Sequence, residues 1–234
     1  MREVSLYIHI PFCVRKCLYC DFLSAPGTEE MKARYVARLC KEIRSYAGHS
    51  LGNVKSVFFG GGTPTCLRPT QIEEVLSAVR EVFSLQPGAE MTVECNPGTV
   101  TAENLHFLRS IGIDRLSIGT QSAVDRELQI LGRIHTFAQA KETYLAAREA
   151  GFENISMDLM SALPGQTIES FRHSLNEVIA LAPEHVSVYS LIIEEGTPFF
   201  EKYGADDAER QRSGNRAGML ISEEEEREMV HLTG

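Results

Sequence analysis

Three cysteines near the N-terminus have the spacing of an iron–sulfur ligand set. Cys13, Cys17 and Cys20 lie within one expected loop in the pattern C-x-x-x-C-x-x-C, directly after an apolar run. Three thiolates supply three of the four ligands that a [4Fe-4S] cluster needs. One iron would then keep an open coordination position, where a substrate or a second cofactor can bind. The spacing therefore favours a catalytic cluster over an electron-transfer cluster, which holds all four irons with cysteine.

The same cysteines leave two other interpretations open. A structural zinc site needs a fourth ligand, and His9 is the nearby candidate, although it lies within the strand-like run. A disulfide with one spare thiol is the second. We expect a reducing compartment, because no apolar export signal precedes the cysteines. Cys66 and Cys95 are scattered singly, and Cys40 lies in a helix-like segment and is expected to be a small buried hydrophobe.

A glycine-rich turn is the second feature that could bind a ligand. Three consecutive glycines at 60–62 precede Thr63, Pro64 and Thr65. Without side chains at these positions, the backbone can approach a ligand closely and present its amides and carbonyls. A bare strand-to-helix turn is the alternative.

Strand-like and helix-like segments alternate along the chain and must position these groups. Runs rich in Val, Ile, Leu and Phe predict strands at about 4–10, 54–60, 90–95, 114–119, 153–159 and 185–192. Amphipathic patterns with Thr caps predict helices at about 28–47, 69–83, 101–110, 136–150 and 167–181. This alternation predicts βαβ units and a parallel sheet. Periodicity alone does not choose between an open doubly wound sheet and a partial barrel.

Unusual residues follow each expected strand. In a parallel α/β barrel, the carboxyl ends of the strands carry the active site. The cysteine loop and the glycine turn follow the first two strands, and the later strand ends carry Glu94, Gln121, Asp158, Tyr189 and Ile192. This regularity predicts one shared site.

The cysteine pattern, with the aromatic Tyr19 before its last cysteine, resembles the radical S-adenosylmethionine (SAM) superfamily. The longer string Tyr-Ile-His-Ile-Pro-Phe-Cys, which ends at Cys13, is similar to one branch of it. That branch holds the oxygen-independent coproporphyrinogen III oxidases and the HemW-type heme chaperones. The resemblance runs from about residue 4 to the last residue and implies an α/β fold, a partial (β/α)6 barrel. It also implies a [4Fe-4S] cluster and SAM, whose reductive cleavage gives methionine and a 5′-deoxyadenosyl radical.

The resemblance further implies roles for individual residues. The three cysteines would bind the cluster, and the glycine turn would bind the amino-acid end of SAM. The implied SAM contacts are Tyr7, Tyr19, Gly61, Gly62, Thr63, Glu94, Gln121, Arg133, Asp158 and Ile192. Among these, the carboxyl and amide side chains would contact the ribose or amino group, and the arginine would pair with a carboxylate.

Several of these residues have a structural alternative. Glu94 could be a solvated loop acid, and Arg133 an exposed arginine at a helix end. Ile192 is expected to be ordinary barrel core if it does not line the pocket. His135 could bind heme iron, but a helix-cap role is favoured because no second ligand adjoins it.

One position separates the two functions of the resembled branch. Its oxidases carry a further cysteine two residues after the third cluster ligand, where this chain has Phe22. The departure favours a heme chaperone that delivers heme to apoproteins. The alternative is oxidative decarboxylation of coproporphyrinogen III to protoporphyrinogen IX. The resemblance implies heme or a porphyrinogen as ligand, heme-accepting apoproteins as partners, and an electron donor of the flavodoxin or ferredoxin type.

The amino-acid composition limits the kinds of partner that we expect. A net charge of −9 disfavours nucleic acid as a partner, because phosphate backbones are bound through Lys and Arg. We expect a cytoplasmic protein with peripheral membrane contact during heme delivery. The barrel is predicted over 1–195. Residues 196–234 are expected to be a linker without clear periodicity, followed by a short helix capped by Ser222 at the start of a truncated C-terminal region.

Overall fold

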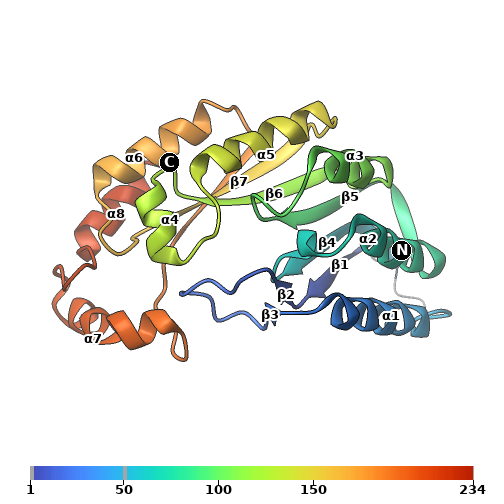
Figure 1. Cartoon of the computed structure of the whole chain (residues 1–234), viewed down its shortest axis with the longest axis horizontal. Helices are drawn as coiled ribbons and strands as arrows, with labels where there is room; N and C mark the ends of the chain where they lie inside the picture. Colours follow the sequence, from blue (N-terminus) through green and yellow to red (C-terminus); the bar gives the residue numbers. More distant parts are fainter. Residues whose placement is uncertain (1–2, 50–51, 234) are drawn as a thin grey trace.

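Six parallel strands form one sheet, and their order in the sheet is their order along the chain (Figure 1). The computed structural model describes residues 3–49 and 52–233. The strands are β1 (Glu3–Ile10), β4 (Asn53–Gly61), β5 (Ser84–Cys95), β6 (Arg115–Gln121), β7 (Asn154–Ser161) and β8 (His185–Ser190). All six predicted strands are confirmed, although β5 begins earlier than expected.

The strand order decides between the two candidate architectures. A doubly wound sheet reverses its order at a switch point, which places helices on both faces. Here the order β1-β4-β5-β6-β7-β8 has no reversal, so right-handed crossovers place successive helices on the same face. Among the described residues, β1 and β8 are not paired with each other. The sheet is therefore a partial barrel, as the family resemblance implied.

The predicted helices are also present, and their caps are formed as expected. They are α1 (Glu29–Ser45), α2 (Pro69–Val82), α3 (Ala102–Ser110), α5 (Phe137–Glu149) and α6 (Ile168–Ile179). Thr28, Thr101 and Thr167 each accept a hydrogen bond from the backbone N–H three residues later. This side-chain oxygen satisfies one of the N–H groups that a helix start leaves unpaired.

The two faces of the sheet differ in character. Ile8 and Ile10 of β1 belong to the apolar core that the sheet shares with α1 and α2, whereas Tyr7, directly before Ile8, is 60 % exposed. Successive side chains of a strand point to opposite faces. The face away from the core consequently carries polar residues such as Glu94 and Asp158, and it is free to bind a ligand.

Two helices were not predicted. A short α4 (Asp125–Leu131) follows β6, and α7 (Pro198–Ser213) occupies most of the segment expected to be an aperiodic linker. The last helix, α8 (Glu223–His231), begins after Ser222 as predicted. The weak pattern of α7 has a physical reason, since it buries only Phe199, Tyr203 and Asp207.

Helix α7 packs against the cysteine loop. The Phe199 N–H donates to the Leu18 carbonyl at 3.0 Å, and the Phe199 ring lies 6.2 Å from the Tyr19 ring between centroids. Phe199 and Tyr203 share a buried apolar cluster with Leu131. The segment after residue 195 is thus attached to the barrel at the point where cluster chemistry is expected. The division of the chain at 195 stays a prediction.

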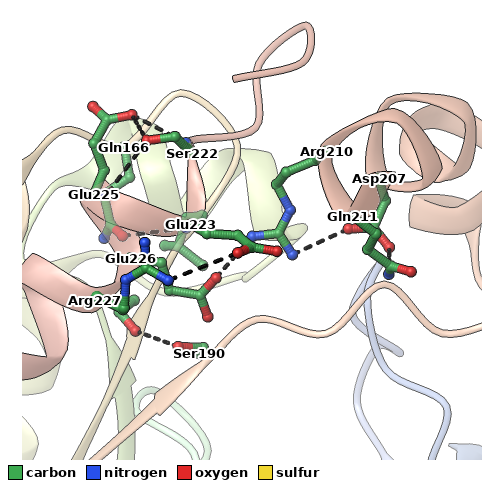
Figure 2. Close-up of polar contacts among 12 residues, drawn as sticks. Gln166, Ser190, Asp207, Arg210, Gln211, Ser222, Glu223, Glu225, Glu226 and Arg227 are labelled. Carbon is green, nitrogen blue, oxygen red and sulfur yellow. Dashed lines mark hydrogen bonds and ion pairs between the residues drawn. The ribbon is translucent and has the colours of Figure 1, made fainter. Parts of the chain in front are cut away.

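Polar contacts join α7 to α8 (Figure 2). Arg210 of α7 pairs with Glu226 of α8 at 2.8 Å and with Asp207 of its own helix at 3.2 Å. Under α8, Met229 is buried against Phe171 of α6. These contacts hold the two C-terminal helices to each other and to the barrel.

We predict that Phe199→Ala lowers the free energy of unfolding by about 3 kcal/mol, because it removes a fully buried ring and leaves a cavity beside the cysteine loop. Urea denaturation measures this change. The neighbouring Phe200 is 39 % exposed, so Phe200→Ala is the matched control and should cost less than about 1 kcal/mol. Equal losses for the two variants would contradict the packing role of Phe199.

Candidate functional site

The cysteine loop is held at both its ends and its middle. Phe12–Cys13 (β2) and Ala25–Pro26 (β3) form a short parallel pair that closes the loop. In the middle, the Leu18 N–H donates to the Leu131 carbonyl at the end of α4, at 3.0 Å. These backbone contacts fix the shape of the loop, and its three thiols are partly exposed.

One cavity at the carboxyl ends of the strands brings the predicted residues together. Apart from Tyr7 and Ile192, every predicted site residue lines it: Cys13, Cys17, Tyr19, Cys20, Gly61, Gly62, Thr63, Glu94, Gln121, Arg133 and Asp158. These residues come from loops and strands that lie far apart in the sequence, as expected for a barrel rim.

Tyr7 and Ile192 lie outside the lining of this cavity. The Tyr7 ring stacks on Phe58 at 6.0 Å between centroids and lines a neighbouring groove. Ile192 is 67 % exposed, so the expectation that it forms barrel core is wrong. Contact of either residue with a cofactor stays a prediction.

The glycine turn is in direct contact with the cysteine loop. The Gly62 N–H donates to the Ile10 carbonyl at 2.8 Å. A Cβ at Gly62 would lie 2.5 Å from the Phe12 carbonyl oxygen and 3.0 Å from the Cys13 sulfur. Gly61 has a φ of 115°, which side chains rarely adopt. The turn is therefore more than a bare strand-to-helix connection, because it positions the first thiol.

Two carboxyl groups lie on the floor of the cavity. Glu94 accepts a hydrogen bond from the Gly61 N–H at 3.0 Å, and burial raises its pKa from the ordinary 4.5 to about 7. Asp158 accepts from Ser117 at 2.9 Å and from Ser156 at 3.2 Å, and burial raises its pKa as well. Among the described residues, neither forms an ion pair. Glu94 is thus not a solvated loop acid, and both carboxyls are placed to receive a cation.

Arg133 points into the same cavity rather than into solvent. Gly132 ends α4 in a left-handed conformation and turns the chain inward. The guanidinium then donates to the Asn96 side chain, to the Gly119 carbonyl at 2.6 Å and to the Cys17 sulfur at 3.7 Å. Its buried Nε has no partner within the described part of the chain. The alternative of an exposed helix-end arginine is wrong, and one donor remains for a ligand.

The last residue of β6 is Gln121. This residue adopts a φ of 67°, and its Oε1 accepts a hydrogen bond from the Tyr189 hydroxyl at 2.9 Å. A non-glycine residue in this region is uncommon and is often found at ligand sites. The contact links strand ends β6 and β8 across the cavity.

His135 is buried behind the site. Its Nε2 lies 3.3 Å from the Thr120 carbonyl, and burial lowers its pKa to about 4. The cap of α5 is the neighbouring Thr136, so the favoured helix-cap interpretation of His135 is wrong. The histidine does not line the cavity either.

The structure bears on the two alternatives for the cysteines. All six cysteines are free thiols. Among the described residues, no three His, Cys, Asp or Glu side chains gather around a position for one metal ion. His9 instead lies with Nε2 at 3.1 Å from the Leu23 carbonyl. A cluster, unlike a single zinc ion, binds each thiolate to a separate iron.

The other three thiols are unsuited to metal binding. Burial raises the pKa of Cys66 to about 11 and that of Cys95 to about 12, so both stay protonated at neutral pH. Cys40 is buried in the core, as predicted. Thiolates are the metal-binding form of cysteine.

The residues present fit the cluster and SAM. Three partly exposed thiols face a space bounded by glycine backbone that any side chain would obstruct. The same space contains one unpartnered Arg133 donor and two half-buried carboxyls that form no ion pair among the described residues. SAM carries a carboxylate and two cationic centres, so its charges complement those of the cavity.

Comparison with known proteins confirms the family. A model of the radical SAM superfamily matches residues 7–178. The chain belongs to the radical SAM superfamily. Members of this superfamily generally bind a [4Fe-4S] cluster and SAM, and the cavity described above lies within the matched residues.

Two kinds of relative were found for this radical SAM chain. The heme chaperone HemW of Bacillus subtilis is 41 % identical over 200 residues, which are 84 % of this chain and 52 % of the relative. HemW of Escherichia coli is 41 % identical over 201 residues, 85 % of this chain and 53 % of the relative. The structure of coproporphyrinogen III oxidase (HemN) from Escherichia coli matches with a TM-score of 0.83 and 29 % identity, covering 99 % of this chain and 51 % of that one. The chain spans about half the length of the curated relatives it matches.

Further residues line the radical SAM cavity that were not among the predicted contacts. They are Arg15, Phe22, Cys95, Asn96, Ser117, Gly119 and Tyr189. Asn96 orients Arg133, and Ser117 orients Asp158. Their positions at strand ends were visible in the sequence, but their roles depend on which neighbouring strand supplies the partner.

We predict that Gly62→Ala lowers the iron and sulfide content of the reconstituted protein at least about fivefold, because the new Cβ collides with the Phe12 carbonyl and the Cys13 sulfur. Iron and sulfide analysis measures this. Gly98→Ala is the control: Gly98 has a φ of 78° but no atom within 4 Å of its Cβ position, so backbone strain alone is tested. Wild-type iron and sulfide content in Gly62→Ala would contradict the prediction, because it would mean that the neighbouring atoms move to accommodate the new Cβ.

We predict that Glu94→Gln becomes stabilising relative to the wild type as pH rises. The folded wild type favours neutral Glu94, so its contribution to stability is full below about 4.5 and is lost as pH rises through about 7. The glutamine stays neutral, so its advantage in unfolding free energy should grow by at most about 3 kcal/mol over this range. Urea denaturation of the cofactor-free chain at both ends of the range measures it. A difference that does not change with pH would mean that Glu94 is well solvated.

Proposed function

We propose that this chain is the radical SAM barrel of a heme chaperone, which binds heme and delivers it to apoproteins. The observation that carries the proposal is the convergence of three thiols, the glycine turn and Arg133 in one cavity. The identity of about 40 % to HemW proteins of two bacteria supports the chaperone assignment. Cluster, SAM and heme are the ligands of this proposal.

Each part of the cavity has a role in holding these groups. Cys13, Cys17 and Cys20 would hold the cluster as thiolates. Glu94 and Asp158 would receive the cationic part of SAM, which lowers the cost of keeping two carboxylates in a partly buried space. Arg133 would orient the carboxylate of SAM with its free donor and hydrogen-bond the Cys17 sulfur. When bound, the cluster and SAM supply one-electron chemistry at a carbon–sulfur bond.

Phe22 supports the chaperone over the oxidase. Its side chain is 60 % exposed and lines the cavity next to the cluster thiols. The oxidases of the resembled branch carry a cysteine at this position. A phenylalanine cannot take part in thiol chemistry, and it presents an apolar ring where the substrate of an oxidase would approach.

Coproporphyrinogen III oxidation is the second candidate. It is favoured by the likeness to the Escherichia coli oxidase, whose structure matches 99 % of this chain. In that case the cavity would generate a radical for decarboxylation of the substrate propionates. The residues of the cavity are compatible with SAM binding in both cases. Only a test with heme and with coproporphyrinogen III can distinguish the two functions.

The proposed setting is the cytoplasm. Within residues 3–49 and 52–233, the structure has no helix that is long and apolar enough to span a membrane. Heme-accepting apoproteins would be the partners, with peripheral membrane contact where the acceptor lies in a membrane.

We predict that the full-length gene product, with its cluster reconstituted, binds heme and forms no protoporphyrinogen from coproporphyrinogen III. Heme titration by absorbance and an anaerobic assay with SAM and a reductant measure the two properties. Phe22→Cys is the informative variant, because it restores the residue type of the oxidases at that position.

Three outcomes are distinguishable. Heme binding without turnover in the wild type supports the chaperone. Stoichiometric protoporphyrinogen formation by the wild type, absent in Cys17→Ser, would establish the oxidase instead. Turnover only in Phe22→Cys would show that this single position separates the two functions.

A further inference from the structure

The N-terminal quarter of the chain has an unusual charge. Residues 11–45 carry seven basic and four acidic side chains, although the whole chain has a net charge of −9. This segment contains the cysteine loop and α1. The net positive charge therefore lies in the segment that contains the cluster cysteines, while the rest of the chain is strongly acidic.

Three of these basic residues lie on one face of α1. Arg34, Arg38 and Lys41 are exposed and follow a spacing of four and three residues, which places them side by side on a helix. None of them forms an ion pair among the described residues, whereas Arg44 on the same helix is paired with Glu81. Their charges are available to a partner.

This face is continuous with the cysteine loop. The groove between the three basic side chains is also lined by Phe12, the residue before Cys13, whose ring meets Tyr35 edge-on at 5.4 Å between centroids. Two more exposed basic residues, Arg15 and Lys16, lie between the first two cluster cysteines. In Figure 1, α1 and the loop from β2 to β3 lie along the same edge of the molecule.

Two acidic residues of α1 flank the three basic side chains: Glu30 precedes Arg34 by four residues and Glu42 follows Arg38 by four, the spacing that makes side chains neighbours on a helix. Glu29 pairs with Lys32 at 2.7 Å in the first turn of α1, and Glu30 adjoins it there. Glu42 lines a different groove, which faces β1.

We propose that Arg15, Lys16, Arg34, Arg38 and Lys41, here called the basic face, form the docking surface for a small acidic electron-transfer protein of the flavodoxin or ferredoxin type. The inference rests on the proposed function in requiring a cluster that must be reduced. One electron leaves the reduced donor and enters the oxidised cluster, and no bond to the protein forms or breaks. Docking here would bring the donor to the Cys13 side of the cluster, at the rim of the cavity that Arg15 also lines.

Charge complementarity acts mainly on the association rate. Steering between opposite charges can raise it from about 10⁵–10⁶ to 10⁸–10⁹ M⁻¹s⁻¹ at low salt. Elsewhere the net negative surface of the chain repels an acidic donor, so the basic face also selects the productive orientation. Screening by salt removes both effects beyond roughly 10 Å at 0.1 M ionic strength.

The test compares two charge-matched variants of the full 234-residue chain. Arg34→Glu/Arg38→Glu reverses the basic face, and Arg126→Glu/Arg172→Glu makes the same change in net charge on α4 and α6, where both arginines are exposed and outside any ion pair among the described residues. Stopped-flow spectroscopy measures reduction of the reconstituted cluster by reduced flavodoxin. Calorimetry measures the affinity of oxidised flavodoxin for the cofactor-free chain, which gives a readout independent of cluster loading.

We expect the basic-face variant to lose about tenfold or more in both rate and affinity at low ionic strength, and to approach the wild type at about 0.5 M, where charges are screened within roughly 4 Å. The control variant should keep the wild-type values, and dithionite should reduce all three proteins equally. Arg34→Lys/Arg38→Lys should restore most of the rate, because the charge is kept.

Other outcomes would overturn the proposal. An unchanged rate and affinity in the basic-face variant, or an equal loss in the control, would show that flavodoxin does not dock there. Binding of the wild type but not the variant to anionic phospholipid vesicles, with flavodoxin reduction unchanged, would assign the basic face to a membrane. Failure of every variant to assemble a cluster would count against the proposed function, while flavodoxin affinity for the cofactor-free chain would still test the docking surface.

Discussion

The close contact between two backbone segments is the constraint on which the site depends. The turn after β4 lies so near the loop after β1 that the N–H groups of Gly62 and Thr63 donate to the carbonyls of Ile10 and Phe12. This approach is possible only because residue 62 has no side chain. The same contact places the Cys13 sulfur beside the ligand cavity. If the cavity holds SAM as proposed, one turn couples cluster ligation to SAM binding, because it contacts both the cysteine loop and the cavity.

The open barrel keeps charged groups in a partly buried space at the expense of stability. Glu94 and Asp158 have raised pKa values because burial disfavours their charged forms, and they form no ion pair among the described residues. Arg115 offsets part of the rise in the pKa of Asp158, and Arg133 retains an unused donor. Such unpaired polar groups are costly in a folded protein and are tolerated where a ligand completes them. The arrangement explains why binding of a charged cofactor would also stabilise the barrel.

The sequence predicted most of the fold and most of the site, and its failures have physical causes. The strands and the capped helices have strong local patterns, so they were recognised. Helix α7 buries few residues, and its function is to hold the cysteine loop through Phe199, a contact with a residue about 180 positions earlier. His135 was expected to cap a helix because no second heme ligand adjoins it in the sequence, but the neighbouring Thr136 is the cap and the histidine ring is buried.

The sequence by itself determined the chemistry that is available: three thiols at a cluster spacing, a glycine turn, and polar residues at successive strand ends. These are properties of residue type and local order, which neighbours in the chain decide. Only the tertiary structure decided which groups meet. It brought Arg133 to Cys17, paired Tyr189 with Gln121, and excluded Tyr7 and Ile192 from the cavity lining. The reason is that the curvature and register of the sheet set the distances between strand ends, and these depend on the packing of all six strands and their helices together.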